Sequence, residues 1–149
     1  MKSRTKARSI ALQVLYEIDL TGHQPDRVLQ ERLDDLPLED DLADFSRIII
    51  YGVINQVKQL DAFIAQHAPE WPLDQVAVID RNILRIALWE FAAQGDTPVK
   101  VAINEAIELA KLYGSDSTPR FVNGVLGSLA NRQSEIHHLF GSNQNKKTD

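Results

Sequence analysis

Apolar residues recur at the spacing of an α-helix along almost the whole of this sequence. The segment near the amino terminus carries one clear stripe, made of Ala7, Ile10, Ala11, Val14, Leu15 and Ile18. These positions follow the i, i+3, i+4, i+7 pattern that places side chains on one face of a helix. No run alternates apolar and polar residues, and no Asn-Gly or Asp-Gly hairpin connects two such runs. The sequence therefore predicts an all-α fold.

Proline, glycine and hydroxyl residues divide this pattern into six predicted helices. The first helix ends at residue 21, the second spans residues 25–36 and the third spans residues 40–67. Three more span about residues 74–93, 97–114 and 117–132. Two of these begin with a hydroxyl residue before a first-turn proline, and Gly114 marks the end of one. Residues 48–54 are apolar on all sides, which predicts that their helix is central.

A break at residues 68–72, which contains Pro69 and Pro72, predicts the boundary between two halves. We expect two three-helix bundle halves, over residues 1–68 and 69–140, packed together as one compact domain. Residues 141–149 are polar and contain no aromatic side chain, so we expect them to form a disordered tail.

Basic residues are concentrated at the amino terminus. Lys2, Arg4, Lys6 and Arg8 precede the first acidic residue, Glu17, although the chain carries a formal net charge of -5. The other 12 basic residues are outnumbered by 21 acidic residues, so we expect no second basic surface of this density. Lys and Arg gain affinity by displacing counterions from phosphates, so the pattern favours nucleic-acid binding at this end. The alternative is a frayed, solvated terminus.

The first helix separates its basic side chains from its core. Lys6 and Arg8 project about 100° to either side of the apolar stripe, so both can remain in water while Ala7 and Ile10 pack. Arg4 falls near the stripe itself, so we expect the chain to fray or to overhang the body there.

The sequence carries no complete catalytic or metal-binding motif. It has no cysteine, no phosphate-binding loop and no nucleophile elbow. Glu135 and His138 have the spacing of half a di-iron motif without its other ligands, and Glu105 and Glu108 are typical of a solvated helix face. We therefore expect a non-enzymatic protein with no cofactor and no metal.

Membrane and export signals are also missing from the pattern. No run is long and apolar enough to span a bilayer, and the basic start is not followed by the continuous apolar segment of a signal peptide. We therefore expect a soluble, cytoplasmic protein.

Two aromatic residues fall outside the centres of their apolar stripes. At 100° per residue, Tyr16 lies nearly opposite the first stripe, with Leu12 on the same side. We expect an exposed patch there, unless another part of the molecule covers it. Phe121 lies at the margin of its stripe, beside Arg120 in a first helical turn. Such a pair can stack a base and face a phosphate, with core packing as the alternative.

Several motifs are similar to those of one known family. They are Ala7-Arg8 followed by residues 11–16 (Ala-Leu-Gln-Val-Leu-Tyr), residues 83–90 (Ile-Leu-Arg-Ile-Ala-Leu-Trp-Glu), residues 101–111 (Val-Ala-Ile-Asn-Glu-Ala-Ile-Glu-Leu-Ala-Lys), Tyr113-Gly114 and residues 121–126 (Phe-Val-Asn-Gly-Val-Leu). In this order the chain resembles the NusB transcription antitermination family from residue 4 to about residue 132.

The resemblance implies a fold of two three-helix halves and a non-enzymatic role. Members of the family pair with ribosomal protein NusE. The pair binds single-stranded boxA RNA in the nascent transcript and helps the elongating RNA polymerase complex, with other Nus factors, to pass terminators in ribosomal RNA operons.

The resemblance also assigns candidate residues by position. The family's arginine-rich start corresponds to Lys2, Arg4, Lys6 and Arg8, which would contact RNA, with Phe121 as the base-contacting aromatic and Arg120 and Lys100 as further phosphate contacts. Tyr16 and Asp80 correspond to positions that face NusE, and the exposed patch adds Leu12 to this partner surface. For Asp80 the alternative is an acid favoured near a helix start.

The sequence is also compatible with two other functions. The same helical module occurs fused to methyltransferases that modify ribosomal RNA, so the chain could be an RNA-targeting module, although it has no glycine-rich cofactor loop of its own. A homodimeric interaction protein could instead cover Tyr16 and Leu12 with a second copy.

Overall fold

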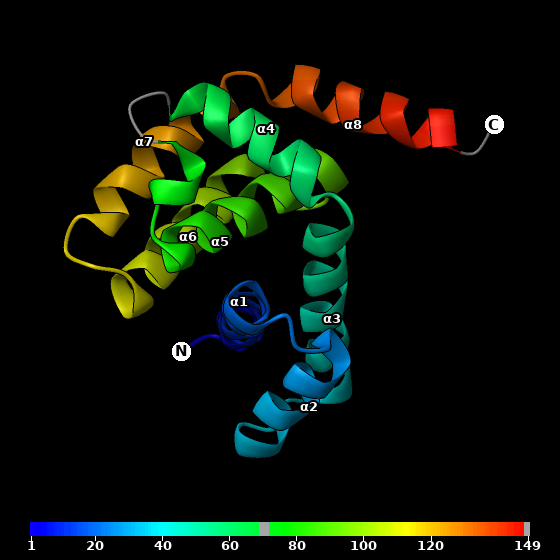
Figure 1. Cartoon of the computed structure of the whole chain (residues 1–149), viewed down its shortest axis with the longest axis vertical. Helices are drawn as coiled ribbons and strands as arrows, with labels where there is room; N and C mark the ends of the chain where they lie inside the picture. Colours follow the sequence, from blue (N-terminus) through cyan, green and yellow to red (C-terminus); the bar gives the residue numbers. More distant parts are fainter. Residues whose placement is uncertain (69–71, 148–149) are drawn as a thin grey trace. The chain divides into compact units, whose positions relative to one another are not determined.

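A computed structural model describes residues 1–68 and 72–147, with side chains as far as residue 142. All regular structure in these ranges is helical, which confirms the predicted all-α fold (Figure 1). The chain divides into two compact units, Met1–Asn55 and Gln56–Asp149. This division precedes the predicted boundary between residues 68 and 69, and residues 69–71 of that predicted break lie outside the described ranges.

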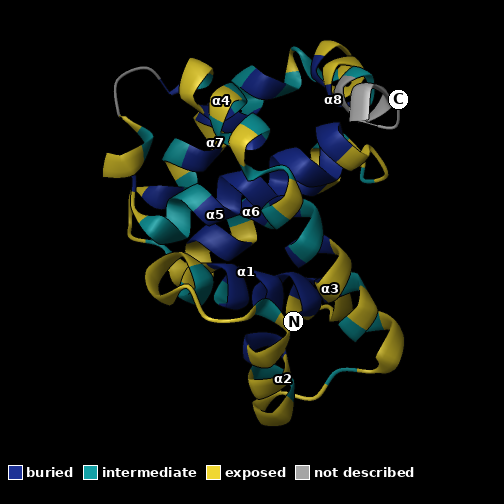
Figure 2. Cartoon of the chain, turned by 45° about the vertical axis from the view of Figure 1, so that its right-hand side comes forward, coloured by how far each residue is buried: buried dark blue, intermediate teal, exposed yellow. Residues whose placement is uncertain are grey.

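The first unit contains α1 (Ser3–Thr21), α2 (Pro25–Asp35) and α3 (Asp40–Asn55). Helix α1 packs against both of the others, and most of its first half is coloured as buried in Figure 2. The buried apolar residues of the unit are Ala7, Ile10, Ala11, Leu12, Val14, Leu15, Val28, Leu29, Ile49, Ile50 and Val53. Gly22 ends α1 in a left-handed conformation with φ of 73°, and its N–H donates to the carbonyl oxygen of Ile18. This end matches the predicted one.

The predicted helix over residues 40–67 is divided in two. Helix α3 ends at Asn55, and α4 (Val57–His67) begins after Gln56, whose φ of -123° and ψ of 18° are not helical. Within α3, Ile49, Ile50 and Val53 are buried, whereas Ile48 is exposed. Residues 48–54, although apolar on all sides, are therefore not all buried. Neither proline nor glycine stands at the break, so the sequence carries no local signal for it.

The second unit is built around α5 (Val78–Leu88), which contacts α4, α6 (Val99–Tyr113) and α7 (Thr118–Ala130). Every residue from Asn82 to Leu88 is buried. The helix predicted over residues 74–93 consists of the 3₁₀ turn η1 (Leu73–Gln75), then α5, and then the π-helical turn η2 (Trp89–Gln94). Helices α6 and α7 begin close to the prolines that predicted their starts.

An ion pair joins α5 to α4. Arg85 Nε and Nη2 donate to the two carboxylate oxygens of Asp61, both at 2.7 Å, and Arg85 Nη1 donates to Asn82 Oδ1 at 3.2 Å. The Arg85 side chain is 8% exposed and that of Asp61 is 27% exposed. A bidentate pair of this kind fixes the orientation of both side chains as well as contributing energy.

Helix α8 (Gln133–Lys147) includes residues 141–147, which belong to the segment predicted as a disordered tail. Ile136 and Phe140 are buried, and two side chains of α8 bond to η2. His137 Nδ1 donates to the carbonyl oxygen of Ala92 at 2.7 Å, and Gln133 Nε2 donates to that of Phe91 at 3.2 Å. The buried start of α8 provides a helical template from which the polar residues continue. Residues 148–149 lie outside the described ranges.

Candidate nucleic-acid interface

The amino end of α1 presents three exposed cations. Lys2 is the N-cap residue of the helix, and Arg4 and Lys6 lie in its first two turns. The first turn contains no acidic residue, and the N-cap residue Lys2 makes no side-chain cap hydrogen bond. The positive end of the helix dipole therefore adds to the three side-chain charges. This arrangement favours a phosphate or another anion.

Arg8 is not part of this exposed group. It is 3% exposed, so the expectation that it remains in water is wrong. Its Cζ lies 5.1 Å from the centroid of the Phe45 ring on α3, a separation within the range of a cation–π contact. The helical wheel of α1 did not reveal this contact because the covering ring comes from another helix.

Arg4 is held more firmly than the sequence predicted. Helix α1 starts at Ser3, so Arg4 is helical rather than frayed, although its side chain is exposed. Its Cζ lies 5.2 Å from the centroid of the same Phe45 ring. Sequence reasoning missed Phe45, whose only available signal was an aromatic residue among the acidic residues that begin α3.

A cleft in the second unit brings three of the predicted site residues together. It has a volume of about 440 Å³ and is lined by Gln75, Val76, Ala77, Asp80, Ser117, Arg120 and Phe121. Arg120 is exposed and Phe121 is half-buried, so both are accessible from the cleft. The sequence assigned Asp80 to a protein partner and the other two to RNA, whereas all three line the same cavity.

Asp80 is oriented by a buried hydroxyl group. Thr118 Oγ1 donates to Asp80 Oδ1 at 3.0 Å, and the Ser115 N–H donates to Thr118 Oγ1 at 2.9 Å. Burial raises the pKa of the Asp80 carboxyl above its ordinary value, and the hydrogen bond from Thr118 partly offsets that rise. The carboxylate therefore faces the cleft in a fixed position on the first turn of α5.

Gly114 makes room for Thr118. Its φ of -88° lies outside the left-handed region, so the glycine is not needed for the helix-ending conformation that the sequence suggested. A Cβ on Gly114 would lie 2.5 Å from Thr118 Cβ, and Thr118 is fully buried. The absence of a side chain at residue 114 thus permits the contact that orients Asp80.

Replacing Gly114 with alanine should lower the free energy of unfolding by about 1–3 kcal/mol, because the added methyl group overpacks this site. Urea unfolding followed by circular dichroism measures the change. Gly124→Ala on α7 is the matched control, since a Cβ there meets no atom within 4 Å. We expect the control to be neutral or slightly stabilising, as alanine favours helix more than glycine does. Equal losses in both variants would contradict this packing argument.

Lys100 lies apart from the cleft. It is exposed in the first turn of α6, whereas Arg120 lies in the first turn of α7, after the short connection that follows the other end of α6. Helix α6 has 15 residues and is therefore about 22 Å long. Lys100 does not line the cleft.

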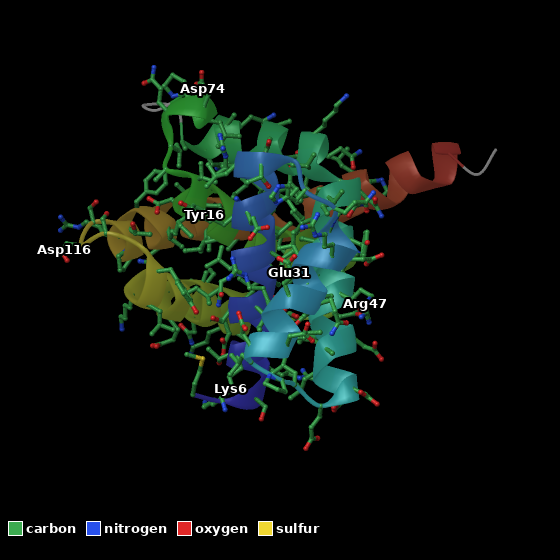
Figure 3. All side chains as sticks on the ribbon, turned by 60° about the horizontal axis from the view of Figure 1, so that its bottom comes forward. Lys6, Tyr16, Glu31, Arg47, Asp74 and Asp116 are labelled. Atoms are coloured by element: carbon green, nitrogen blue, oxygen red, sulfur yellow. The ribbon has the colours of Figure 1, made fainter. Side chains whose placement is uncertain are left out.

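The two predicted partner residues on α1 differ in exposure. Tyr16 is 37% exposed, as its outward position predicted, whereas Leu12 is fully buried. The exposed placement of Leu12 is therefore wrong, because every residue from Ala7 to Leu12 is buried and this stretch is covered on more than one side. In Figure 3, Lys6 lies near the amino end of α1 and Tyr16 lies toward the other end. The two are separated by about 15 Å along the helix.

Within residues 1–68 and 72–147, no three or more histidine, aspartate or glutamate side chains are grouped so that they could hold a metal ion. No helix there is long and apolar enough to cross a membrane.

Comparison with known proteins identifies the family. The sequence model of the NusB family matches residues 5–131. This chain belongs to the NusB family. The Transcription antitermination protein NusB of Dehalococcoides mccartyi (strain 195) is 46% identical over 128 residues, which cover 86% of this chain and 90% of that protein. The NusB of Bacillus subtilis (strain 168) is 43% identical over 129 residues, covering 87% and 95%.

Solved structures of NusB proteins share the fold. NusB of T. maritima superposes with a TM-score of 0.80 at 30% sequence identity, covering 87% of this chain and 92% of that one. A chain from the crystal structure of antitermination factors NusB and NusE in complex with dsRNA superposes with a TM-score of 0.77 at 24% identity, covering 93% and 98%.

Proposed function

We propose that this NusB family member is a non-catalytic adaptor that pairs with ribosomal protein NusE. The pair binds boxA RNA and, with other Nus factors, keeps the elongating polymerase transcribing ribosomal RNA operons. The family match over residues 5–131 carries the proposal. It is supported by relatives that are named transcription antitermination proteins. It is also supported by a solved complex of NusB, NusE and dsRNA, one chain of which has the same fold.

The RNA contacts in this proposal come from both units. Lys2, Arg4 and Lys6 on α1 bind phosphates, while Phe121 stacks on an unpaired base beside Arg120. Single-stranded RNA is recognised in this way, through stacking and contacts to base edges, with phosphate contacts supplying affinity. Lys100 contributes a phosphate contact away from the cleft.

The charge distribution explains why a partner is needed. Three exposed cations at one helix end provide few phosphate contacts, and the chain as a whole carries a net charge of -5 that repels RNA. RNA affinity of the chain alone is then weak and salt-sensitive. NusE supplies the additional contacts, and Tyr16 and Asp80 face it.

The alternatives are less well supported. Both named relatives are transcription antitermination proteins, which favours the adaptor over an RNA-targeting module of a methyltransferase. The burial of Leu12 removes one of the two residues on which the homodimer rested.

Size-exclusion chromatography of the chain with NusE and a boxA RNA tests the proposed assembly. We expect a complex that contains all three components and elutes before any pair of them. Elution of the chain alone in the presence of both NusE and RNA would contradict the proposal.

Replacing Tyr16 with lysine should weaken NusE binding at least tenfold, because aromatic anchors contribute strongly to interfaces and the new charge must be desolvated. Isothermal titration calorimetry measures the affinity, and the melting temperature should stay near that of the wild type. Tyr113→Lys is the matched control, since Tyr113 is 36% exposed at the end of α6. An equal loss in the control, or unchanged binding by Tyr16→Lys, would remove Tyr16 from the proposed interface.

A further inference from the structure

Phe45 was not among the predicted site residues, but it contacts Arg4, one of the proposed RNA-binding residues. The side chain belongs to α3 and is half-buried, and the guanidinium groups of Arg4 and Arg8 both lie over its ring. We propose that Phe45 is a positioning residue that holds the exposed Arg4 guanidinium in place for an RNA phosphate. This inference rests on the proposed RNA binding.

The backbone beside Phe45 is fixed against α1. Ser46 Oγ donates to the carbonyl oxygen of Ala7 at 2.8 Å, and both residues are buried. This bond sets the register between α3 and α1 one residue away from Phe45. The ring is therefore part of the packed structure, and Arg4 is the exposed member of the pair.

Electrostatics explain what the ring does for the two arginines. Arg4 and Arg8 are separated by one helical turn, a spacing at which like charges repel each other. The negative face of an aromatic ring attracts guanidinium groups within about 6 Å of its centroid. Arg47 Nη1 donates to Asp44 Oδ1 at 2.8 Å, so the acid next to Phe45 is already bound to another arginine. The ring thus holds a cation without neutralising it, which a carboxylate would do.

A pre-positioned arginine binds a phosphate at a lower entropic cost. A free arginine loses rotamer freedom when it binds, whereas one already stacked on a ring loses less. The planar guanidinium can stack through one face while its N–H groups point outward toward phosphate oxygens. Arg8 is buried, so it does not take part in this contact with the RNA.

Phe45→Leu removes the ring and retains an apolar side chain. We expect it to weaken binding of boxA RNA by the chain–NusE pair about two- to fivefold at fixed salt, the range of an exposed cation–π contact. NusE binding should not change. Phe45→Tyr retains a ring and should bind RNA as the wild type does, which controls for altered folding.

A double-mutant cycle separates positioning from a general structural effect. If Phe45 acts through Arg4, then Phe45→Leu should have no further effect on RNA affinity in an Arg4→Ser background. An undiminished effect in that background, or wild-type affinity of the Phe45→Leu variant, would overturn the inference. Failure of the wild-type pair to bind RNA would instead overturn the proposed function, so the two failures are distinguishable.

Discussion

Replacing Lys2, Arg4 and Lys6 together with serine should weaken binding of a single-stranded boxA RNA about a hundredfold at 0.1 M salt. Each phosphate contact to a single strand contributes about 0.7 to the slope of log affinity against log salt, so three lost contacts reduce the slope by about 2. At 0.1 M salt this slope corresponds to roughly two powers of ten in affinity. Folding and NusE binding should be retained, because all three side chains are exposed.

Fluorescence anisotropy titrations at several salt concentrations measure both the RNA affinity and its dependence on salt. The matched control replaces Arg27, Lys58 and Lys111, three exposed cations outside the proposed contacts, with serine. It changes the net charge equally, so it isolates direct contact from long-range attraction. An unchanged slope in the Lys2, Arg4 and Lys6 variant, or an equal change in the control, would mean that the amino end of α1 does not contact phosphates.

Arg8 is left out of this variant for a structural reason. It is buried against Phe45, so its removal would alter this packing and obscure the RNA measurement.

Replacing Asp61 with alanine should lower the free energy of unfolding by about 3 kcal/mol, because the buried Arg85 guanidinium loses both charge-assisted bonds to that carboxylate. For a chain of this size the melting temperature should fall by roughly 6–12 °C. Urea and thermal unfolding followed by circular dichroism measure the two changes.

The control for this prediction replaces both partners. A chain with Asp61→Leu and Arg85→Met removes the charge that the single substitution leaves unpaired, so it should recover much of the lost stability. If the double variant is at least as unstable as Asp61→Ala, the loss comes from packing rather than from an unpaired buried charge.

Local patterns predicted the parts of the fold that depend on local chemistry. The stripe from Ala7 to Ile18 predicted α1 and its end at residue 21, because helix periodicity involves only near neighbours. The break at Gln56 has no such local signal, because neither proline nor glycine stands there.

The candidate site shows the same limit. The exposure of Tyr16 and Lys6 could be predicted from their positions on the first helix. Arg4 falls near the apolar stripe, and its side chain is nevertheless exposed on a regular helix. The burial of Leu12 and Arg8 could not, since residues distant in the sequence determine it. The grouping of Asp80 with Phe121 in one cleft likewise depends on how α5 and α7 pack.

The affinity for a boxA RNA with and without NusE shows whether RNA binding by this chain depends on NusE. Anisotropy titrations at one fixed salt concentration should show weak binding by the chain alone. Adding NusE should tighten it at least tenfold, which corresponds to about 1.4 kcal/mol. Titration of NusE alone with the same RNA provides the reference. Equal affinities of the chain with and without NusE would contradict a shared RNA-binding surface.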